Sequence, residues 1–495
     1  MDWAEERRGS FALSRWVFLR LLALVYAVAF LSLAPQIAAL VGGRGLEPAA
    51  QELAAARSAF GAARFWLEPT LCWIGASDGF LEGLCWVGAA LSLVLFLDVA
   101  PAWSALALYV LYLSIATVGG DFLGFQWDVL LLETGLLATM LAPWRLRPGL
   151  ARDGEPLAAA RWLVWWLVFR LMFASGVVKF ASGDPTWSEL RALEFHYQTQ
   201  PLPTTLAWYA HQLPAWIHKL SAGWMFGVEL GASLLVFAPR LFRHAGAWLL
   251  LSLQALIALT GNYGFFNLVS VALCLFLFDD AALARAVPTR WRAKLAEPRA
   301  ASVPRLQRAA TAVLAVVVVA VSGIQTTNLL LDAVGRPGLG REARELVALA
   351  RPLRSINTYG LFAVMTTERP EIVLEGSADG LAWKSYEFRW KPGDLARAPG
   401  WVAPHMPRLD WQMWFAALGG ARQERWLRVL VQRLLEGEPR VLALFAFDPF
   451  PGAPPKYVRA FVDRYEFTTR GERAATGHWW KRERLGLLLP ATSLK

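Results

Sequence analysis

Residues 312–323 read AVLAVVVVAVSG, a run without a single charged side chain. The uncharged stretch extends on both sides and covers the whole segment 309–330. A helix needs about 20 mostly apolar residues to cross the hydrocarbon core of a membrane. This segment therefore predicts a membrane-spanning helix, the clearest one in the chain.

Similar apolar runs recur throughout the first two thirds of the sequence. Of the 495 residues, 56% are hydrophobic and only 18% are charged, and the mean hydropathy is +0.38. Soluble proteins rarely have this composition, because their surface must meet water. We expect a polytopic α-helical membrane bundle of about nine spans, at residues 16–41, 80–99, 103–118, 125–141, 162–180, 223–237, 245–260, 265–278 and 309–330.

Basic side chains between the predicted spans support this count. They form four clusters, which comprise Arg7, Arg8 and Arg15; Arg145, Arg147, Arg152 and Arg161; Arg240 and Arg243; and Arg290, Arg292, Lys294, Arg299 and Arg305. With nine spans, all four clusters fall on one side of the membrane, and the positive-inside rule makes that side the cytoplasm. We therefore expect a cytoplasmic N-terminus and an outer location for residues after about 332.

The net charge of +10 follows from the same clusters, because cytoplasmic loops face anionic lipid. We find no nucleic-acid-binding module and expect no nucleic-acid partner. The chain divides into a multi-pass helical domain, residues 1–332, and an extracytoplasmic domain, residues 333–495. The outer loop 181–222 is rich in tryptophan and proline. Indole rings are stable at headgroup depth, so we expect this loop to lie in the membrane interface.

The last third of the chain has the alternation of a soluble domain. The expected strands are 370–376, 382–390 and two short ones within 457–468, and the expected helices are 410–418 and 423–435. Asp379-Gly380 is a hairpin-turn dipeptide between the first two strands. The sequence thus predicts a small α+β domain, rich in antiparallel sheet, outside the membrane.

Charged residues inside the predicted spans are the first candidates for function. They are Asp128, Glu133, Arg170, Lys179 and Glu229. Each costs about 3 kcal/mol or more at the bilayer centre unless it is satisfied. In a structural interpretation, Arg170 pairs with Glu133 or Glu229 and fixes the helices. In a functional interpretation, the charges line an internal polar pocket for a substrate or a proton.

The outer loop contains a second group of polar residues, Glu194, His196, Tyr197 and Gln200. Lys179 and His196 together offer a polarising cation and a base, so they are the candidate catalytic residues, whereas a hydrogen-bonded structural role is the alternative for His196. The histidine spacing does not match a zinc motif. We also find no nucleotide-binding loop and no nucleophile elbow. The sequence therefore predicts no metal and no cofactor.

Aromatic residues in the outer domain, Trp411, Trp414 and Phe415, have two interpretations. They could form part of the domain core. They could instead form an exposed patch that binds a client protein.

Several long strings resemble the lipase maturation factor family. They are GFQWDVLLLETGLLATMLAP (124–143), RLMFASGVVKF (170–180), GDPTW (183–187), LEFHYQTQPLPTTLAWYAHQLPAWIHKLS (193–221), LTGNYGFFNLVSVALCLFLFDD (259–280), INTYGLFAVMTTERPEIVLEGS (356–377), PHMPRLDWQMWFAAL (404–418), DPFPGAPPKYVRAFVDRYEF (448–467) and GHWWKRERLG (477–486). The resemblance runs from about Arg15 to the C-terminus in one order. The abundance of Ala, Arg, Leu and Trp is typical of a bacterial member with a GC-rich genome.

This resemblance implies a membrane-anchored factor that helps secreted proteins, lipases in the animal family, reach their active folded state. It implies an endoplasmic reticulum membrane in a eukaryote, a plasma membrane in a bacterium, and client binding within 356–467. The family is also distantly similar to vitamin K-dependent carboxylase-like proteins. An enzyme that acts on a lipid or quinone-like substrate through Lys179 and His196 is therefore the alternative to the favoured non-enzymatic role. A transporter is a third, less favoured possibility.

Overall fold

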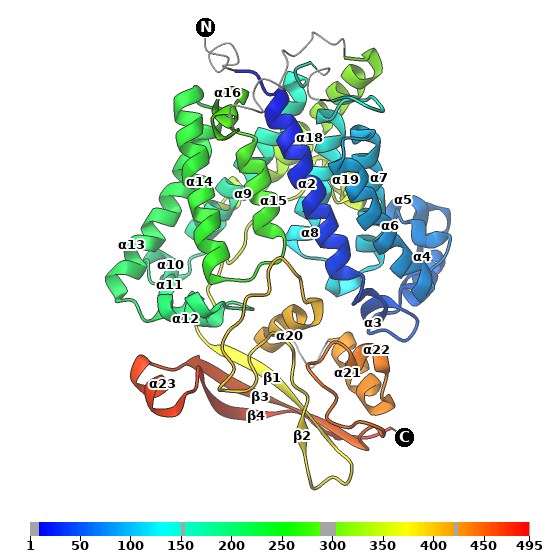
Figure 1. Cartoon of the computed structure of the whole chain (residues 1–495), viewed down its shortest axis with the longest axis vertical. Coiled ribbons are helices and arrows are strands. Elements are labelled where there is room, and N and C mark those ends of the chain that lie inside the picture. The colour runs from blue at the N-terminus through cyan, green and yellow to red at the C-terminus, as the bar shows by residue number, and fades with distance from the viewer. Residues whose placement is uncertain (1–8, 150–153, 288–302, 420–423, 495) are drawn as a thin grey trace.

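The computed structural model describes residues 9–149, 154–287, 303–419 and 424–494. A bundle of helices forms one end of the molecule, and a domain with a β-sheet forms the other (Figure 1). The first described residues, from Gly9 onward, lie at the end of the bundle that is remote from the sheet. The described part of the chain thus has the two regions that the composition predicts.

The bundle is built from long apolar helices. They are α2 (Ala12–Leu33), α6 (Asp78–Phe96), α7 (Pro101–Val118), α9 (Ala158–Ala181), α14 (Arg240–Thr260) and α18 (Arg305–Ala333), together with the continuous segment Ala215–Phe237. Among the described residues, these seven are long and apolar enough to cross a membrane. An eighth is possible if α15 (Phe266–Leu275) and the helix after it, bent by 107°, form one span. The multi-pass prediction is confirmed, with a span count close to the expected nine.

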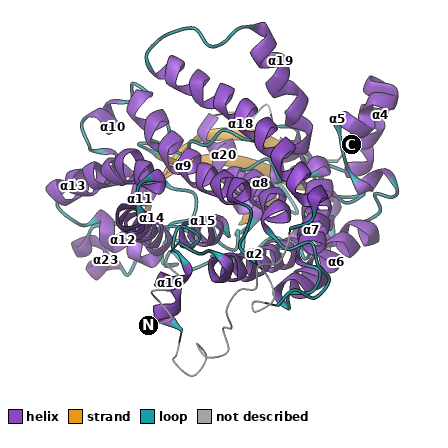
Figure 2. Ribbon diagram, turned by 90° about the horizontal axis from the view of Figure 1, so that it is seen from above, coloured by secondary structure: helices purple, strands orange, loops and turns teal. Residues whose placement is uncertain are grey.

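The remaining predicted span, 125–141, forms helix α8 (Gln126–Leu141), which has only 16 residues. Most of its side chains are buried, and it is surrounded by other helices of the bundle (Figure 2). A helix enclosed by protein need not match the hydrocarbon thickness, because its ends are solvated by neighbouring protein groups. This position brings its charged residues into the interior of the bundle.

The predicted span 223–237 is not one regular helix. Helix α13 (Ala215–Phe226) continues into a π-helical turn, Gly227–Gly231, and a 3₁₀ turn, Ala232–Phe237. The turn begins and ends with glycine, which lowers helix stability by about 1 kcal/mol relative to alanine. The irregular turn presents Glu229 to the inside of the bundle, where it is buried.

The described members of all four basic clusters gather at the N-terminal end of the bundle. The guanidinium groups of Arg161 and Arg243 lie 4.6 Å and 5.5 Å from the ring of Phe11, and Arg240 pairs with Asp279. Members that lie outside the described residues are Arg7, Arg8, Arg152, Arg290, Arg292, Lys294 and Arg299. The described members thus lie near the start of α2, at the opposite end of the bundle from the sheet.

The outer domain contains an antiparallel sheet of β1 (Arg369–Ser377), β2 (Lys384–Ser385), β3 (Tyr457–Phe467) and β4 (Trp480–Thr492), in the order β2-β1-β3-β4. Two expectations were wrong in detail, and one strand was missed. The segment 457–468 forms one strand and not two, the strand expected at 382–390 pairs over only two residues, and β4 was not predicted. Strand β4 is exposed over most of its length, so its sequence carries little alternation to reveal it.

Two helices of the outer domain, α20 (Arg408–Gly419) and α21 (Arg425–Glu436), agree closely with the prediction. They lie between the sheet and the bundle (Figure 1). On α21, Trp426, Leu430 and Leu434 are fully buried. Burying each such side chain stabilises the domain by roughly 1.5–3 kcal/mol, which explains why this amphipathic pattern was predictive.

The outer loop 181–222 forms short helices α10 (Pro185–Ser188), α11 (Ala192–Thr199) and α12 (Thr205–His211) before α13 begins. This loop contacts the outer domain: Gln212 Nε2 donates to the carbonyl of Thr468 at 3.2 Å. Trp187 and Trp208 are buried in protein, whereas Trp216 is 65% exposed. Part of the expected interfacial loop is therefore covered by the outer domain.

Candidate functional site

The outer end of the bundle meets the outer domain through buried ion pairs. Asp128 on α8 accepts two hydrogen bonds from Arg408 on α20, with Nη1–Oδ2 2.6 Å and Nη2–Oδ1 2.7 Å. The Tyr112 hydroxyl donates to the same carboxylate at 2.5 Å. Both charged side chains are at most 1% exposed. A bidentate arginine–carboxylate pair is strong and directional, so Arg408 holds α20 on α8 in a fixed orientation.

Glu133, five residues after Asp128 on α8, is the centre of a second network. It forms an ion pair with Arg170 on α9. Its Oε2 atom accepts hydrogen bonds from the Tyr359 hydroxyl at 2.7 Å and from the Asn357 backbone N–H at 3.2 Å. Arg170 in turn donates to the Asn357 carbonyl at 2.9 Å. The structural interpretation of Arg170, as a partner of Glu133, agrees with these contacts.

The segment around Asn357 and Tyr359 is non-helical, yet it lies against the bundle helices. Gln126, which shares a helix face with Glu133, exchanges hydrogen bonds with the backbone of Gly360, both 3.2 Å long. Irregular backbone at membrane depth must have its polar groups satisfied by protein. Gln126, Glu133 and Arg170 form hydrogen bonds with the backbone of this segment. These polar residues therefore hold a non-helical segment of the outer domain against the bundle.

Lys179 pairs with Glu229 and not with the outer domain. Its Nζ atom lies 2.8 Å and 2.9 Å from the two carboxylate oxygens. Both side chains are 7% exposed. The pair joins α9 to the π-helical turn, and the carboxylate neutralises the ammonium group. A general base or a cation that polarises a substrate would have to leave this pair first.

His196 lies on α11, where burial, and to a smaller extent the Lys179 charge, lower the pKa of the imidazole to about 4. Its Nε2 atom is 3.3 Å from the Tyr263 hydroxyl. That hydroxyl donates to Gln200 Oε1 at 2.9 Å, and Gln200 Nε2 donates to the Thr260 carbonyl at 2.8 Å. His196 and Gln200 thus belong to one hydrogen-bonded cluster that ties the outer loop to the end of α14.

The other two residues of the outer-loop motif lie apart from this cluster. Glu194 pairs with Arg191 at 3.2 Å near the surface. Tyr197 packs its ring 5.7 Å from that of His218. The motif therefore divides into an interior pair and two residues that hold the loop itself.

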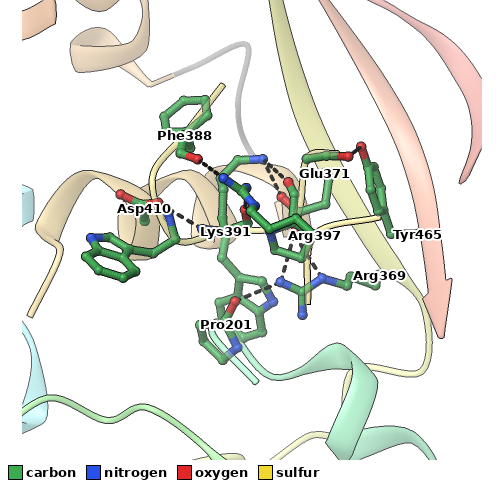
Figure 3. Close-up of polar contacts among 12 residues, drawn as sticks. Pro201, Arg369, Glu371, Phe388, Lys391, Arg397, Asp410 and Tyr465 are labelled. Carbon is green, nitrogen blue, oxygen red and sulfur yellow. Dashed lines mark hydrogen bonds and ion pairs between the residues drawn. The ribbon is translucent and has the colours of Figure 1, made fainter. Parts of the chain in front are cut away.

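A third network joins the sheet to the outer loop (Figure 3). Glu371 on β1 accepts a hydrogen bond from Arg369 Nε at 2.9 Å and forms an ion pair with Lys391, whose Nζ atom lies 2.7 Å from Oε2. The three side chains are at most 3% exposed. Arg369 also donates to the backbone carbonyls of Gln198 at 2.8 Å and Pro201 at 2.7 Å. The guanidinium group therefore fastens β1 to the loop that leaves the bundle.

The aromatic residues of α20 belong to the same interface. Trp411 is 3% exposed, and its ring centroid lies 4.7 Å from that of Trp127 on α8. Trp414 is 5% exposed and donates from Nε1 to the Thr199 carbonyl at 2.8 Å. Phe415 is 42% exposed. The burial of Trp411 and Trp414 favours the interpretation that they belong to the core. Of the three residues, only Phe415 exposes surface to a partner.

Sequence reasoning found the bundle side of the first two networks and missed their outer-domain side, and it found none of the ion pairs of the third. It identified Asp128, Glu133 and Arg170, because charges within apolar runs are conspicuous. It missed Arg408, Arg369 and Tyr359, because they lie in a segment where charged and polar residues are ordinary. The available signal was the presence of two carboxylates, Asp128 and Glu133, in one apolar helix. Such groups require partners from elsewhere in the chain.

The arrangement has the chemistry of a structural joint. In the part of the chain that the structure describes, no group of three or more His, Cys, Asp or Glu side chains could hold a metal ion. Neither Lys179 nor His196 lines either of two surface hollows in the described residues, one at Trp208 and Arg473 and one at Arg15 and Trp144. The charged groups of the spans instead satisfy one another and the docked outer domain.

Together, the fold and this joint define a multi-pass membrane protein that carries a β-sheet domain docked on one end of its helical bundle. Comparison with protein families specifies it further. The lipase maturation factor transmembrane domain matches residues 13–285, and the lipase maturation factor C-terminal domain matches residues 355–490. The chain therefore belongs to the lipase maturation factor family.

Curated relatives agree with this assignment. Lipase maturation factor 2 of Homo sapiens is 37% identical over 97% of this chain and 83% of its own length. Lipase maturation factor 1 of Bos taurus is 34% identical over 99% of this chain and 91% of its own length. No solved structure matches the chain. The recognised resemblance is confirmed, and the relatives' names give no support to the enzyme alternative.

Proposed function

We propose that this protein is a membrane-anchored maturation factor that helps secreted, lipase-like proteins reach their active folded state. The similarity to proteins named lipase maturation factors carries the proposal, because it extends over nearly the whole chain and includes both family domains. A match confined to the helices would support only a shared membrane fold. A match that includes the docked outer domain supports a shared role.

The proposed mechanism is binding. An incompletely folded client exposes apolar surface that aggregates unless another protein covers it. The outer domain, within 356–467, supplies the binding surface, and its buried joint to the bundle holds that surface next to the membrane. The exposed ring of Phe415 lies at the edge of this joint, so we place one client contact there. This mechanism requires no cofactor.

We further propose that the outer domain faces the endoplasmic reticulum lumen in a eukaryote, or the outer side of the plasma membrane in a bacterium. The N-terminus is then cytoplasmic. Two observations support this orientation: the basic clusters collect at one end of the bundle, and the sheet lies at the other (Figure 1). A reporter fused at residue 480 should therefore be active only on the extracytoplasmic side. A cytoplasmic reporter signal would contradict the orientation.

Gene deletion tests the function itself. Secreted lipase is collected from the deletion strain and from a strain that carries the gene again, and enzymatic activity is measured beside lipase mass. We expect a lower activity per unit mass in the deletion strain, restored by the gene. An unchanged ratio, with either equal or reduced mass, would contradict a maturation role.

Client contact is tested with the full-length protein in detergent, because the outer domain shares buried charged contacts with the bundle. We expect unfolded lipase to co-purify with the protein, and Phe415→Ala to reduce the captured amount. Phe447→Ala is the matched control, since Phe447 is exposed in the same domain. Equal loss in both variants would refute a specific contact at Phe415.

The enzyme and transporter alternatives have no observation in their favour. The enzyme alternative requires Lys179 to be available within an enclosed polar pocket. Lys179 is instead engaged by both oxygens of Glu229.

A further inference from the structure

An open hollow of about 560 Å³ lies where the outer loop faces the outer domain. One wall comes from α12 and the other from α23 (Arg470–Thr476), which lie on the same side of the molecule (Figure 1). The lining residues are Trp208, Tyr209, Arg470, Arg473, Ala474 and Gly477. The hollow is separate from the buried networks that join the two domains.

The aromatic wall holds one arginine in a fixed position. The Arg473 guanidinium lies 3.6 Å from the ring centroid of Trp479 and 5.1 Å from that of Trp208. Trp208 is only 2% exposed, and its ring centroid lies 5.4 Å from that of Trp479. Stacking on two indole rings orients the planar fork of an arginine and leaves its edge for a ligand.

The hollow has an uncompensated positive charge. Within the described residues, neither Arg470 nor Arg473 forms an ion pair, and no carboxylate lines the hollow. The nearest acidic residue on α23, Glu472, instead binds the Thr469 backbone at 2.7 Å and Lys481 at 3.3 Å. Two arginines without an acidic partner attract an anion. A guanidinium group can donate two parallel hydrogen bonds to a pair of phosphate oxygens.

An apolar surface continues from the hollow towards the membrane. On α12, Leu206 and Tyr209 are exposed three positions apart, and Leu213, two residues after the helix, is also exposed. Trp216, at the start of α13, is 65% exposed, and α13 begins the membrane-crossing segment Ala215–Phe237. Exposed tryptophan and leucine at the end of a spanning segment are typical of the interface between headgroups and acyl chains. The hollow therefore lies beside the bilayer surface.

We propose that this hollow binds the phosphate group of a membrane phospholipid. Arg470 and Arg473 bind the phosphate oxygens, and the exposed face of Leu206, Leu213 and Trp216 contacts the acyl chains. A lipid fits the site better than a soluble anion, because the charged and apolar surfaces are continuous. The site goes beyond the proposed maturation function, since it needs no client.

Lipid binding to the delipidated full-length protein tests the proposal. Short-chain phosphatidylglycerol is titrated into the protein in detergent, and bound lipid is counted by native mass spectrometry. We expect the double variant Arg470→Gln, Arg473→Gln to weaken the tightest binding by about tenfold or more, since two charge-assisted contacts are lost. Arg428→Gln, which removes one exposed charge elsewhere in the outer domain, should leave it unchanged.

A second variant avoids disturbing the stacked arginine. Ala474→Trp fills the hollow while both charges remain, and it should also abolish the tightest binding. Unchanged lipid binding in both test variants would overturn the proposal. If inorganic phosphate displaced the bound lipid as effectively as added phosphatidylglycerol does, the hollow would be a site for a free anion. If polyglutamate did so, the hollow would be a site for an acidic protein segment. Either result would overturn the lipid assignment.

Discussion

Carboxylates at the domain joint and carboxylates on the sheet differ sharply, although both are paired with arginine. Asp128 and Glu133 are completely buried, and each accepts hydrogen bonds from several groups. On the sheet, Arg464 contacts Glu483, but the side chains are 33% and 64% exposed. Asp128 joins the two domains through Arg408, and Glu133 joins them through Tyr359 and Asn357, whereas the Arg464–Glu483 pair lies on an exposed surface.

This difference shows that an ion pair has no fixed value. Water competes for an exposed pair and salt screens it, so the pair contributes little. A buried pair has paid a large desolvation cost, and removing one partner leaves an uncompensated charge. The joint is therefore strong against separation and sensitive to single substitutions. Variants on each side of the comparison should differ by several-fold in effect.

The largest effect is expected for Arg408→Ala. The substitution leaves Asp128 buried without its cation, which should cost about 3–5 kcal/mol of stability. Thermal unfolding of the purified full-length protein in detergent measures this loss. A combined Arg408→Met, Asp128→Leu variant should recover part of it, because no buried charge remains. A stability of Arg408→Ala equal to that of the natural sequence would show that the joint is not formed.

Lys179→Ala is expected to rank next. It strands Glu229 inside the bundle, a loss that should approach about 3 kcal/mol. Lys179→Met with Glu229→Leu should restore stability and leave lipase maturation intact. A stable double variant that has lost function would instead favour a direct chemical role for Lys179. The measurements are thermal unfolding and lipase activity per unit mass.

A single hydrogen bond is tested by Tyr359→Phe. The variant keeps the ring but removes the hydroxyl that donates to Glu133, and a hydrogen bond to a charged group contributes about 1.5–3 kcal/mol. Ser355 and Tyr109 lie close by and also hydrogen-bond to each other, so Ser355→Ala is a neutral-bond control with a smaller expected loss. Equal losses would contradict a stronger bond from Tyr359 to Glu133 than from Ser355 to Tyr109.

We expect low pH to lower the stability of the folded protein through His196 in the outer loop. The folded state holds the pKa of this imidazole at about 4, below its ordinary 6.5, so the unfolded chain binds the extra proton between these values. Stability should therefore be full above pH 6.5 and fall as the pH drops towards 4. Unfolding temperatures at pH 7 and pH 5 measure the loss, which should shrink in His196→Gln. An identical loss in this variant would assign the sensitivity to other groups.

The smallest effect is expected for Arg464→Ala on the sheet. Water replaces the lost contact with Glu483, so the unfolding temperature should stay within experimental error. A drop comparable to that of Arg408→Ala would remove the contrast between the two regions.

Prediction from the sequence succeeded where a residue's neighbours along the chain decide its environment. Helices α20 and α21 and strand β1 were expected close to their observed positions, because their apolar periodicity reflects a buried face. Strand β4 was missed, because it pairs through its backbone and exposes most side chains. Only half of the site could be predicted. Asp128 and Glu133 interrupt an apolar helix and are conspicuous, whereas Arg408 and Arg369 lie in segments where charged residues are common.

The sequence alone determined which part of this protein meets hydrocarbon and which meets water, because the cost of burying charge in lipid depends on composition over about 20 residues. The tertiary structure alone decided which charges neutralise one another. Asp128 and Arg408 are separated by 280 positions in the chain. No local pattern encodes such a pair, since their meeting depends on how the outer domain docks on the bundle.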